Sequence, residues 1–310
     1  MIRPLSPSDH VVLVDCSGWL HRAYHATAPM RRADGTPVNC VWTFERMTDA
    51  LIHRGVGGER ATHLGVVFDA RGPSFRRAIF ADYKANRGPR DPDLTVQEPL
   101  VRDAVRAWGL EPIEQPGVEA DDLIATYAEL AADAGARVTI ATQDKDFYQL
   151  VRPGVSLYDR GSGSEGSPGY RAPRWIGRDE VVAKFGVEPE QVVDVQAIMG
   201  DAVDNVPGVH GIGEKGAADL IRHFGSLDAL LADIDAIPKP QHRRAFLAPS
   251  RVKDGETAVH DALLSRRLVT LDRFLLPIVP PDELVVPVPD YDRVRAFRRD
   301  MGFENGREAA

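Results

Sequence analysis

Three short apolar runs, each closely followed by an aspartate, constrain the fold of this chain more than any other feature. The runs occupy residues 11–14, 64–68 and 138–141, and they are followed by Asp15, Asp69 and Asp144. Continuous rather than alternating apolar character predicts strands that are buried on both faces of a parallel sheet.

Helical patterns separate these runs, at residues 19–26, 41–54, 99–108 and 121–134. The alternation of strand and helix predicts an α/β fold with a mainly parallel sheet flanked by helices. Sites in such sheets lie outside the carboxyl ends of the strands, so the three aspartates should converge on one edge.

Further acidic residues accompany these three. Glu119, Asp121 and Asp122 open the helix before the third strand, and Asp201 and Asp204 follow a later helical pattern. Taken singly, each cluster is also explained by helix capping or a turn. Capping does not explain all of them together. The candidate metal ligands are therefore nine carboxylates: Asp15, Asp69, Glu119, Asp121, Asp122, Asp144, Asp146, Asp201 and Asp204.

Carboxylates gathered in one place repel each other, and several would have to bind protons unless a cation is present. Oxygen ligands without supporting histidine or cysteine favour Mg²⁺ or Mn²⁺ over zinc. The nine candidate carboxylates carry more negative charge than the net charge of −8 of the whole chain, so the acidity of the chain is attributed to this predicted site. The two cysteines are too few for a disulfide scaffold or a cysteine-based zinc site.

One segment of this acidic chain is basic. Residues 71–90 contain six basic side chains and one acidic one, and the basic set includes Arg76, Arg77, Lys84 and Arg87. A local basic patch is typical of nucleic-acid binding. Such a run is also what a solvated helix face looks like.

A glycine-rich hairpin follows the last acidic pair. Gly211 and Gly213 flank Ile212, and Lys215 lies in the first turn of the helix that begins there. Glycines let the backbone approach a ligand, and the free amides at a helix start attract an anion. The pattern predicts a helix-hairpin-helix element that contacts the DNA backbone without reading sequence.

These residues resemble the 5′ nuclease family, which comprises the 5′-3′ exonuclease domain of bacterial DNA polymerase I, phage 5′ exonucleases and flap endonucleases. The resemblance spans nearly the whole chain, and its motifs are Val14-Asp15-Cys16-Ser17, Tyr83-Lys84-Ala85-Asn86-Arg87, Gly117-Val118-Glu119-Ala120-Asp121-Asp122, Asp144-Lys145-Asp146, Gly200-Asp201 and Gly211-Ile212-Gly213-Glu214-Lys215. It implies a PIN-like 5′ nuclease fold. It also implies a structure-dependent 5′-3′ exonuclease or flap endonuclease that hydrolyses DNA by a two-metal-ion mechanism in replication or repair.

The resemblance also implies roles for residues. Asp15, Asp69, Glu119 and Asp121 would form the first metal site, and the other five carboxylates the second, partly through water. Two or three Mg²⁺ or Mn²⁺ ions are implied, with K⁺ at the hairpin. Residues 71–99 resemble the helical arch of the family. There Lys84 and Arg87 would meet the scissile phosphate and Tyr83 would stack on the terminal base, with Arg22 near the DNA.

We expect a catalytic domain at residues 9–178 and a helical domain at residues 179–305. The expected partner is DNA with a 5′ flap or a free 5′ end, or an RNA–DNA hybrid, bound by a monomer. No apolar run is long enough to span a membrane and no secretion signal is evident, so a cytoplasmic, nucleoid-associated, stand-alone nuclease is expected. Two alternatives remain: a catalytically inactive module that binds branched DNA, and an acidic-site ribonuclease of the toxin type.

Overall fold

The computed structural model describes residues 3–163, 165–167 and 169–303. It contains a six-stranded sheet in the order β3-β2-β1-β4-β5-β6, in which β6 is antiparallel to β5 and every other pair is parallel. The strands are β1 (His10–Asp15), β2 (His63–Val67), β3 (Pro112–Ile113), β4 (Arg137–Ala141), β5 (Val155–Asp159) and β6 (Arg174–Ile176). The predicted α/β fold with a mainly parallel sheet is confirmed.

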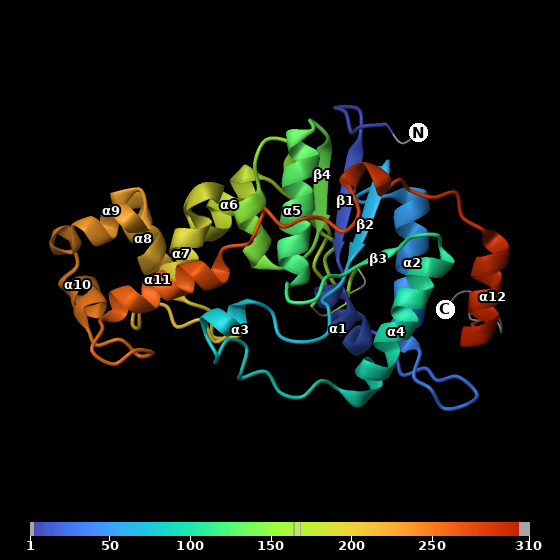
Figure 1. The fold of residues 1–310 in the computed structure, drawn as a ribbon, viewed down its shortest axis with the longest axis horizontal. Coiled ribbons are helices and arrows are strands. Elements are labelled where there is room, and N and C mark those ends of the chain that lie inside the picture. The colour runs from blue at the N-terminus through green and yellow to red at the C-terminus, as the bar shows by residue number, and fades with distance from the viewer. Residues whose placement is uncertain (1–2, 164, 168, 304–310) are drawn as a thin grey trace.

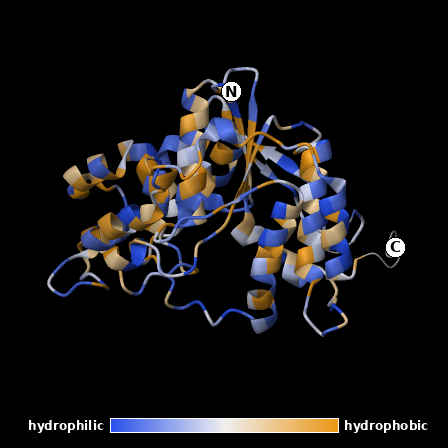
Figure 2. Ribbon diagram, turned by 45° about the vertical axis from the view of Figure 1, so that its right-hand side comes forward, coloured by the Kyte–Doolittle hydropathy of each residue, from blue (hydrophilic) through white to orange (hydrophobic). Residues whose placement is uncertain are grey.

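The central strand β1 is buried on both faces, as its continuous apolar sequence predicts. Val11 and Leu13 pack in one core with α5 (Ala120–Asp133). Val12 and Val14 pack in a second core with α1 (Cys16–Ala26), α2 (Asn39–Arg54) and α4 (Pro92–Ala107). Figure 2 shows hydrophobic residues concentrated on the strands and on the helix faces toward them. Full burial of each such side chain contributes roughly 1.5–3 kcal/mol.

The strand register determines which residues meet at the carboxyl edge of the sheet. Asp15 lies opposite Val67 of β2, and Val14 lies opposite Ala141 of β4. Asp69 and Asp144 follow these partners within three residues. All three aspartates therefore lie at the same edge, as predicted.

A helical portion continues from the sheet. Its elements are α6 (Arg178–Phe185), α7 (Val192–Met199), α8 (Glu214–Phe224), α9 (Leu227–Ala232), α10 (Pro240–Leu247) and α11 (Ala258–Val269), with short 3-10 turns at Pro189–Gln191 and Ile234–Ala236. Figure 1 places these helices on one side of the sheet and α12 (Tyr291–Met301) on the other. Residue 305, the expected end of this portion, lies outside the described residues. No helix in the described ranges is long and apolar enough to cross a membrane.

Two sequence expectations are corrected. The helix expected from Pro99 begins at Pro92, because Asp91 caps it and Pro92 occupies its first turn, and Pro99 lies inside it. Residues 71–91 do not form a helical arch: α3 (Arg76–Ile79) is a single turn, followed by turns and extended chain. Beyond Pro289 the chain forms α12, which is capped by Asp290.

Candidate active site

The carboxyl edge of the sheet is built around Asp15, the last residue of β1. One carboxylate oxygen caps α1 by accepting hydrogen bonds from the Ser17 and Gly18 amides at 3.1 and 3.3 Å. The other accepts a hydrogen bond from Thr142 Oγ1 at 2.9 Å. Asp69 Oδ1 accepts from the Ala120 amide at 2.8 Å, which joins the end of β2 to the start of α5. Both aspartates are thus fixed by the backbone.

Burial and mutual electrostatic repulsion raise the pKa values of the carboxylates at this edge. Burial and the charge of Asp144 raise the pKa of Asp15 to about 6. Burial and the charges of Asp15, Asp144 and Asp69 raise the pKa of Asp121 well above its usual range. Burial and the charge of Asp144 likewise raise the pKa of Asp146 to about 7. Burial is the largest cause of each shift, and the neighbouring carboxylate charges add to it, so the ionised forms of these side chains are disfavoured without a cation.

Glu119 is surrounded by hydrogen-bond donors. Its Oε1 accepts from Lys84 Nζ at 2.9 Å and from Ser74 Oγ at 3.1 Å. Its Oε2 accepts from Tyr83 Oη at 3.2 Å and from Arg76 Nη1 at 3.4 Å. The residues that follow β2 therefore converge on this one carboxylate.

Basic side chains also reach the second carboxylate group. Arg87 pairs with Asp204, and Lys84 Nζ lies 3.7 Å from the other Asp204 oxygen. Lys145 Nζ lies 2.6 Å from Asp201 Oδ2. The predicted catalytic residues Lys84 and Arg87 are thus brought to the carboxylate edge, and both are held there by acids.

Among the described residues, no three carboxylate, imidazole or thiol side chains lie in an arrangement that could hold a metal ion. Lysine and arginine side chains lie between the carboxylates instead. The chemistry of the donors nonetheless fits a divalent ion. All predicted ligands are carboxylates, and the raised pKa values of Asp15 and Asp146 mark an excess of negative charge.

Asp122 is not one of these ligands, which corrects the sequence prediction. Its side chain is 0% exposed. Both of its oxygens accept from Arg76, at 2.6 and 2.7 Å, and Oδ1 also accepts from the Asp272 amide at 2.9 Å. The Glu119 amide donates to Oδ2 at 3.4 Å, so each oxygen of this carboxylate accepts two hydrogen bonds from the protein and none of its four lone-pair sites is left for a metal ion.

Two predicted DNA contacts are also corrected. Arg76 is 1% exposed, and its guanidinium is taken up by Asp122 and by the carbonyls of Leu268 and Thr270. The Tyr83 ring is 4% exposed and packs with Val206 and neighbouring apolar side chains. A base cannot stack on an enclosed ring. Arg77, by contrast, is exposed.

The predicted hairpin is present and accessible. Gly211 has a φ of +87°, and a Cβ at Gly211 or Gly213 would meet no atom within 4 Å. Gly213 is the N-cap of α8, and Lys215 in its first turn is exposed. Ile212 is buried and anchors the loop to the helical portion. The backbone at these glycines is therefore open to the approach of a ligand, as an anion contact at a helix start requires.

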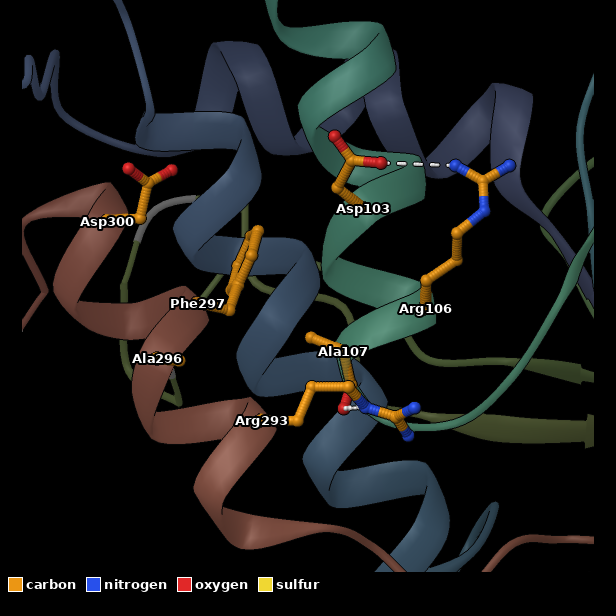
Figure 3. A pocket seen from close by; sticks show the side chains of 7 residues that line it. All are labelled: Asp103, Arg106, Ala107, Arg293, Ala296, Phe297 and Asp300. Carbon is orange, nitrogen blue, oxygen red and sulfur yellow. Dashed lines mark hydrogen bonds and ion pairs between the residues drawn. The ribbon is translucent and has the colours of Figure 1, made fainter.

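Two surface cavities are present. One, of about 440 Å³, adjoins the carboxylate edge and is lined by Gly72, Pro73, Ser74, Arg77, Tyr83, Lys84 and Glu119. The other, of about 450 Å³, lies between α4 and α12. Figure 3 shows that Arg106 at its rim pairs with Asp103 and that Arg293 donates to the Ala107 carbonyl. Asp300, which also lines this cavity, pairs with Arg32, so the charged residues here have partners in the protein.

Sequence reasoning missed several residues that shape the site. Thr142 holds Asp15, Lys145 pairs with Asp201, and Gln196 donates to Asp146. Lys145 lies between two predicted ligands, so its position was a usable signal. The role of Gln196 depends on the packing of α7 beside residues 145–150 and carries no local signal.

Comparison with known proteins places this geometry in a family. A model described as the 5′-3′ exonuclease N-terminal resolvase-like domain matches residues 10–186, and one described as the 5′-3′ exonuclease C-terminal SAM fold matches residues 187–292. The chain belongs to the 5′-3′ exonuclease family. A 5′-3′ exonuclease of Aquifex aeolicus is 34% identical, covering 94% of this chain and 92% of that protein.

Other members of this family are longer. DNA polymerase I of Rhizobium leguminosarum is 39% identical over 96% of this chain, which spans 28% of that protein. Among solved structures, T5 5′-exonuclease with divalent metal ions (zinc) bound aligns with a TM-score of 0.63 and 22% identity, covering 94% of this chain and 98% of that one. The catalytic core of Rad2 with a DNA substrate aligns at 0.59 and 19%, covering 97% and 91%. These likenesses support the fold.

Proposed function

We propose that this chain is a divalent-metal-dependent 5′ nuclease that hydrolyses phosphodiester bonds at 5′ flaps or free 5′ ends of DNA. The observation that carries the proposal is the carboxylate edge itself. Asp15, Asp121, Asp144 and Asp146 have raised pKa values because of burial, together with the charges of neighbouring carboxylates. Such a set is costly to keep unless it binds a multiply charged ion.

Two groups of carboxylates would hold the ions. The first comprises Asp15, Asp69, Glu119 and Asp121, and the second Asp144, Asp146, Asp201 and Asp204. Divalent ions at such positions supply a lowered pKa for the attacking water and charge stabilisation for the leaving oxygen. T5 5′-exonuclease with divalent metal ions bound and the catalytic core of Rad2 with a DNA substrate share this fold, which is consistent with the proposal.

Lys84 and Arg87 have a role that follows from their present partners. Both pair with carboxylates of the proposed metal ligands. Metal binding at Glu119 and Asp204 would compete with these ion pairs and free the two basic side chains. A phosphate that enters beside the carboxylates would then become their partner. The exchange keeps positive charge next to the scissile bond, where negative charge develops during the reaction.

The hairpin supplies the remaining contact with DNA. Its open glycines, the start of α8 and the exposed Lys215 contact phosphates and not base edges. We propose that selection of branched or free ends comes from the distance between this contact and the carboxylate edge and not from sequence. We also propose a division into a catalytic domain at residues 9–178 and a helical domain at residues 179–305. The two family models meet a few residues later, at residues 186 and 187.

The test is a cleavage panel with protein stripped of metal by EDTA. A labelled 5′-flap DNA, a duplex with a free 5′ end and a hairpin RNA are each incubated with no metal, Mg²⁺ or Mn²⁺. We expect cleavage of the two DNA substrates, in the presence of metal alone. Cleavage of the RNA but neither DNA would favour the acidic-site ribonuclease, and metal-dependent binding without cleavage would favour the inactive branched-DNA-binding module.

A further inference from the structure

One face of α1 carries two buried donors without an acceptor. Trp19 and Arg22 are three residues apart on this helix, so they lie on the same face. Within the described residues, Trp19 Nε1 and Arg22 Nη1 belong to the four buried side-chain atoms that have no hydrogen-bond partner. A buried donor without a partner destabilises the fold, because it has lost its hydrogen bonds to water and gained none in exchange. Their pairing on one face indicates that an acceptor from outside the chain completes the site.

Two further arginines reach this place from the connection between β5 and β6. The Arg160 guanidinium lies 5.2 Å from the centre of the Trp19 ring, and its Nη1 donates to the Met47 sulfur, a weak acceptor. Arg171 donates to Gln143 Oε1 at 2.7 Å and to Ser162 Oγ at 3.3 Å. Both arginines are exposed.

The three arginines lack acidic partners. Across the described ranges, none of Arg22, Arg160 and Arg171 has a carboxylate oxygen within 4.0 Å, whereas nearby Arg174 lies 3.5 Å from Asp159. Burial and the charge of Arg171 lower the pKa of Arg22, Asp159 raises it, and the smaller effects of Arg160 and Asp15 oppose each other. Asp159 and Asp15 act from beyond ion-pair distance, so the three arginines together remain a concentration of positive charge that can bind an anion.

This cluster adjoins the proposed metal site. Gln143, which receives the Arg171 hydrogen bond, donates to the Gly161 carbonyl at 2.8 Å and lies between Thr142 and Asp144. Asp15 caps the helix that carries Arg22. Lys84 and Arg87 approach the same carboxylates from the segment after β2, so the cluster is a separate source of positive charge.

We propose that Arg22, Arg160 and Arg171 form a second phosphate-binding site, which holds a backbone phosphate of the DNA strand beside the carboxylate edge. This inference rests on the proposed nuclease function, because that function supplies the phosphate ligand. Arginine suits the task, since its planar fork donates to two oxygens of one phosphate. The Trp19 ring is enclosed and covered by Arg160, so a stacked base is not the ligand. The site contacts backbone and reads no sequence.

The test compares two double variants that remove the same charge. Arg160→Gln with Arg171→Gln removes the cluster, and Arg106→Gln with Arg295→Gln removes two exposed arginines that pair with acids on α4 and α12. Binding of a 5′-flap DNA is measured by fluorescence anisotropy in Ca²⁺ at several salt concentrations. In the cluster variant the negative slope of log K against log salt should become shallower by about 1, which corresponds to the loss of roughly one phosphate contact. The control should keep the wild-type slope, and an unchanged slope in the cluster variant overturns the inference.

Two further arms separate the explanations. The flap is prepared with a 5′-phosphate and with a 5′-hydroxyl, and the cluster variant should lose the same slope with both. A loss confined to the 5′-phosphate substrate would contradict the backbone assignment and make the ligand a terminal phosphate. Wild-type protein is assayed for cleavage of the same DNA in Mg²⁺. If it cuts while the cluster variant binds like wild type, this inference alone fails; if it neither binds nor cuts, the proposed function fails.

Discussion

Arg76 donates two parallel hydrogen bonds to Asp122, with Nη1 2.6 Å from Oδ2 and Nη2 2.7 Å from Oδ1. Neither side chain is more than 1% exposed. The same guanidinium donates to the carbonyls of Leu268 and Thr270, at the end of α11 and just after it. One buried ion pair therefore joins the segment after β2, the first turn of α5 and the helical portion. Asp122 serves the structure and not the metal.

Asp122→Asn should lower the free energy of unfolding by about 3–5 kcal/mol, because it leaves the buried Arg76 charge without its counter-ion. Asp144→Asn is the matched control. Asp144 lies at an exposed position, but desolvation by the surrounding protein and the charge of Asp204 raise its pKa. Its ionised form therefore costs stability, and an uncharged side chain should leave stability unchanged or increased in metal-free protein. Both are measured by urea unfolding in EDTA. Equal effects of the two substitutions would contradict separate roles.

Lys84→Ala should lower the single-turnover cleavage rate by ~10²-fold or more, the scale at which one electrostatic stabiliser of a transition state acts. DNA affinity in Ca²⁺ should fall far less, since the hairpin still holds the backbone. Lys253→Ala, which removes an exposed lysine paired with Glu256, is the control. A normal rate at saturating enzyme with weakened binding would make Lys84 an ordinary phosphate contact.

Lys215→Ala should weaken binding equally for DNAs of different sequence and reduce the salt slope by about 0.9 on duplex DNA, the contribution of one phosphate. The exposed position of Lys215 in the first turn of α8 is the reason. Binding isotherms at several ionic strengths measure the slope. A slope that stays at the wild-type value would rule out the hairpin as a backbone contact.

The contribution of His10 to stability should fall as the pH drops below the usual pKa of histidine, whereas the raised pKa values of Asp15 and Asp146 act in the opposite direction. Burial lowers the pKa of His10, whose ring atoms lie 3.0 Å from the Arg60 carbonyl and 2.8 Å from Thr139 Oγ1. Below about pH 6.5 the His10 ring binds a proton in the unfolded chain but not in the folded chain. The contribution of neutral His10 to the free energy of unfolding is therefore fully present above about pH 6.5 and is lost as the pH falls below it. Relative to wild type, His10→Gln should therefore become progressively more stable in urea unfolding as the pH is lowered from 7 to 5. A variant with the wild-type pH dependence would exclude His10 as the source.

Sequence patterns predict the sheet well because its information is local. The apolar run Val11–Val14 specifies a buried strand, and the parallel register then brings Asp15, Asp69 and Asp144 together. The helix α12 could also have been found, since Val294, Phe297 and Met301 have helical spacing after the capping Asp290.

The roles of adjacent carboxylates could not be predicted in the same way. Asp121 and Asp122 are neighbours in sequence but point about 100° apart around a helix, so only one can face the edge. Which one does so is decided by Arg76, which lies 46 residues away. The arginine cluster depends likewise on contacts between α1 and the β5–β6 connection. Such long-range pairing leaves no trace in a local pattern.

Whether the carboxylate edge cuts DNA through bound divalent ions is decided by one measurement. Metal-stripped wild-type protein and Asp144→Asn are mixed at saturating concentration with a labelled 5′-flap DNA, and the single-turnover rate is followed as Mg²⁺ is added. Wild-type cleavage should be absent without metal and rise with Mg²⁺, whereas Asp144→Asn should bind the flap in Ca²⁺ yet cut it at least ~10²-fold more slowly. Undiminished cutting by wild-type protein without metal, or by Asp144→Asn with it, would contradict the proposed site.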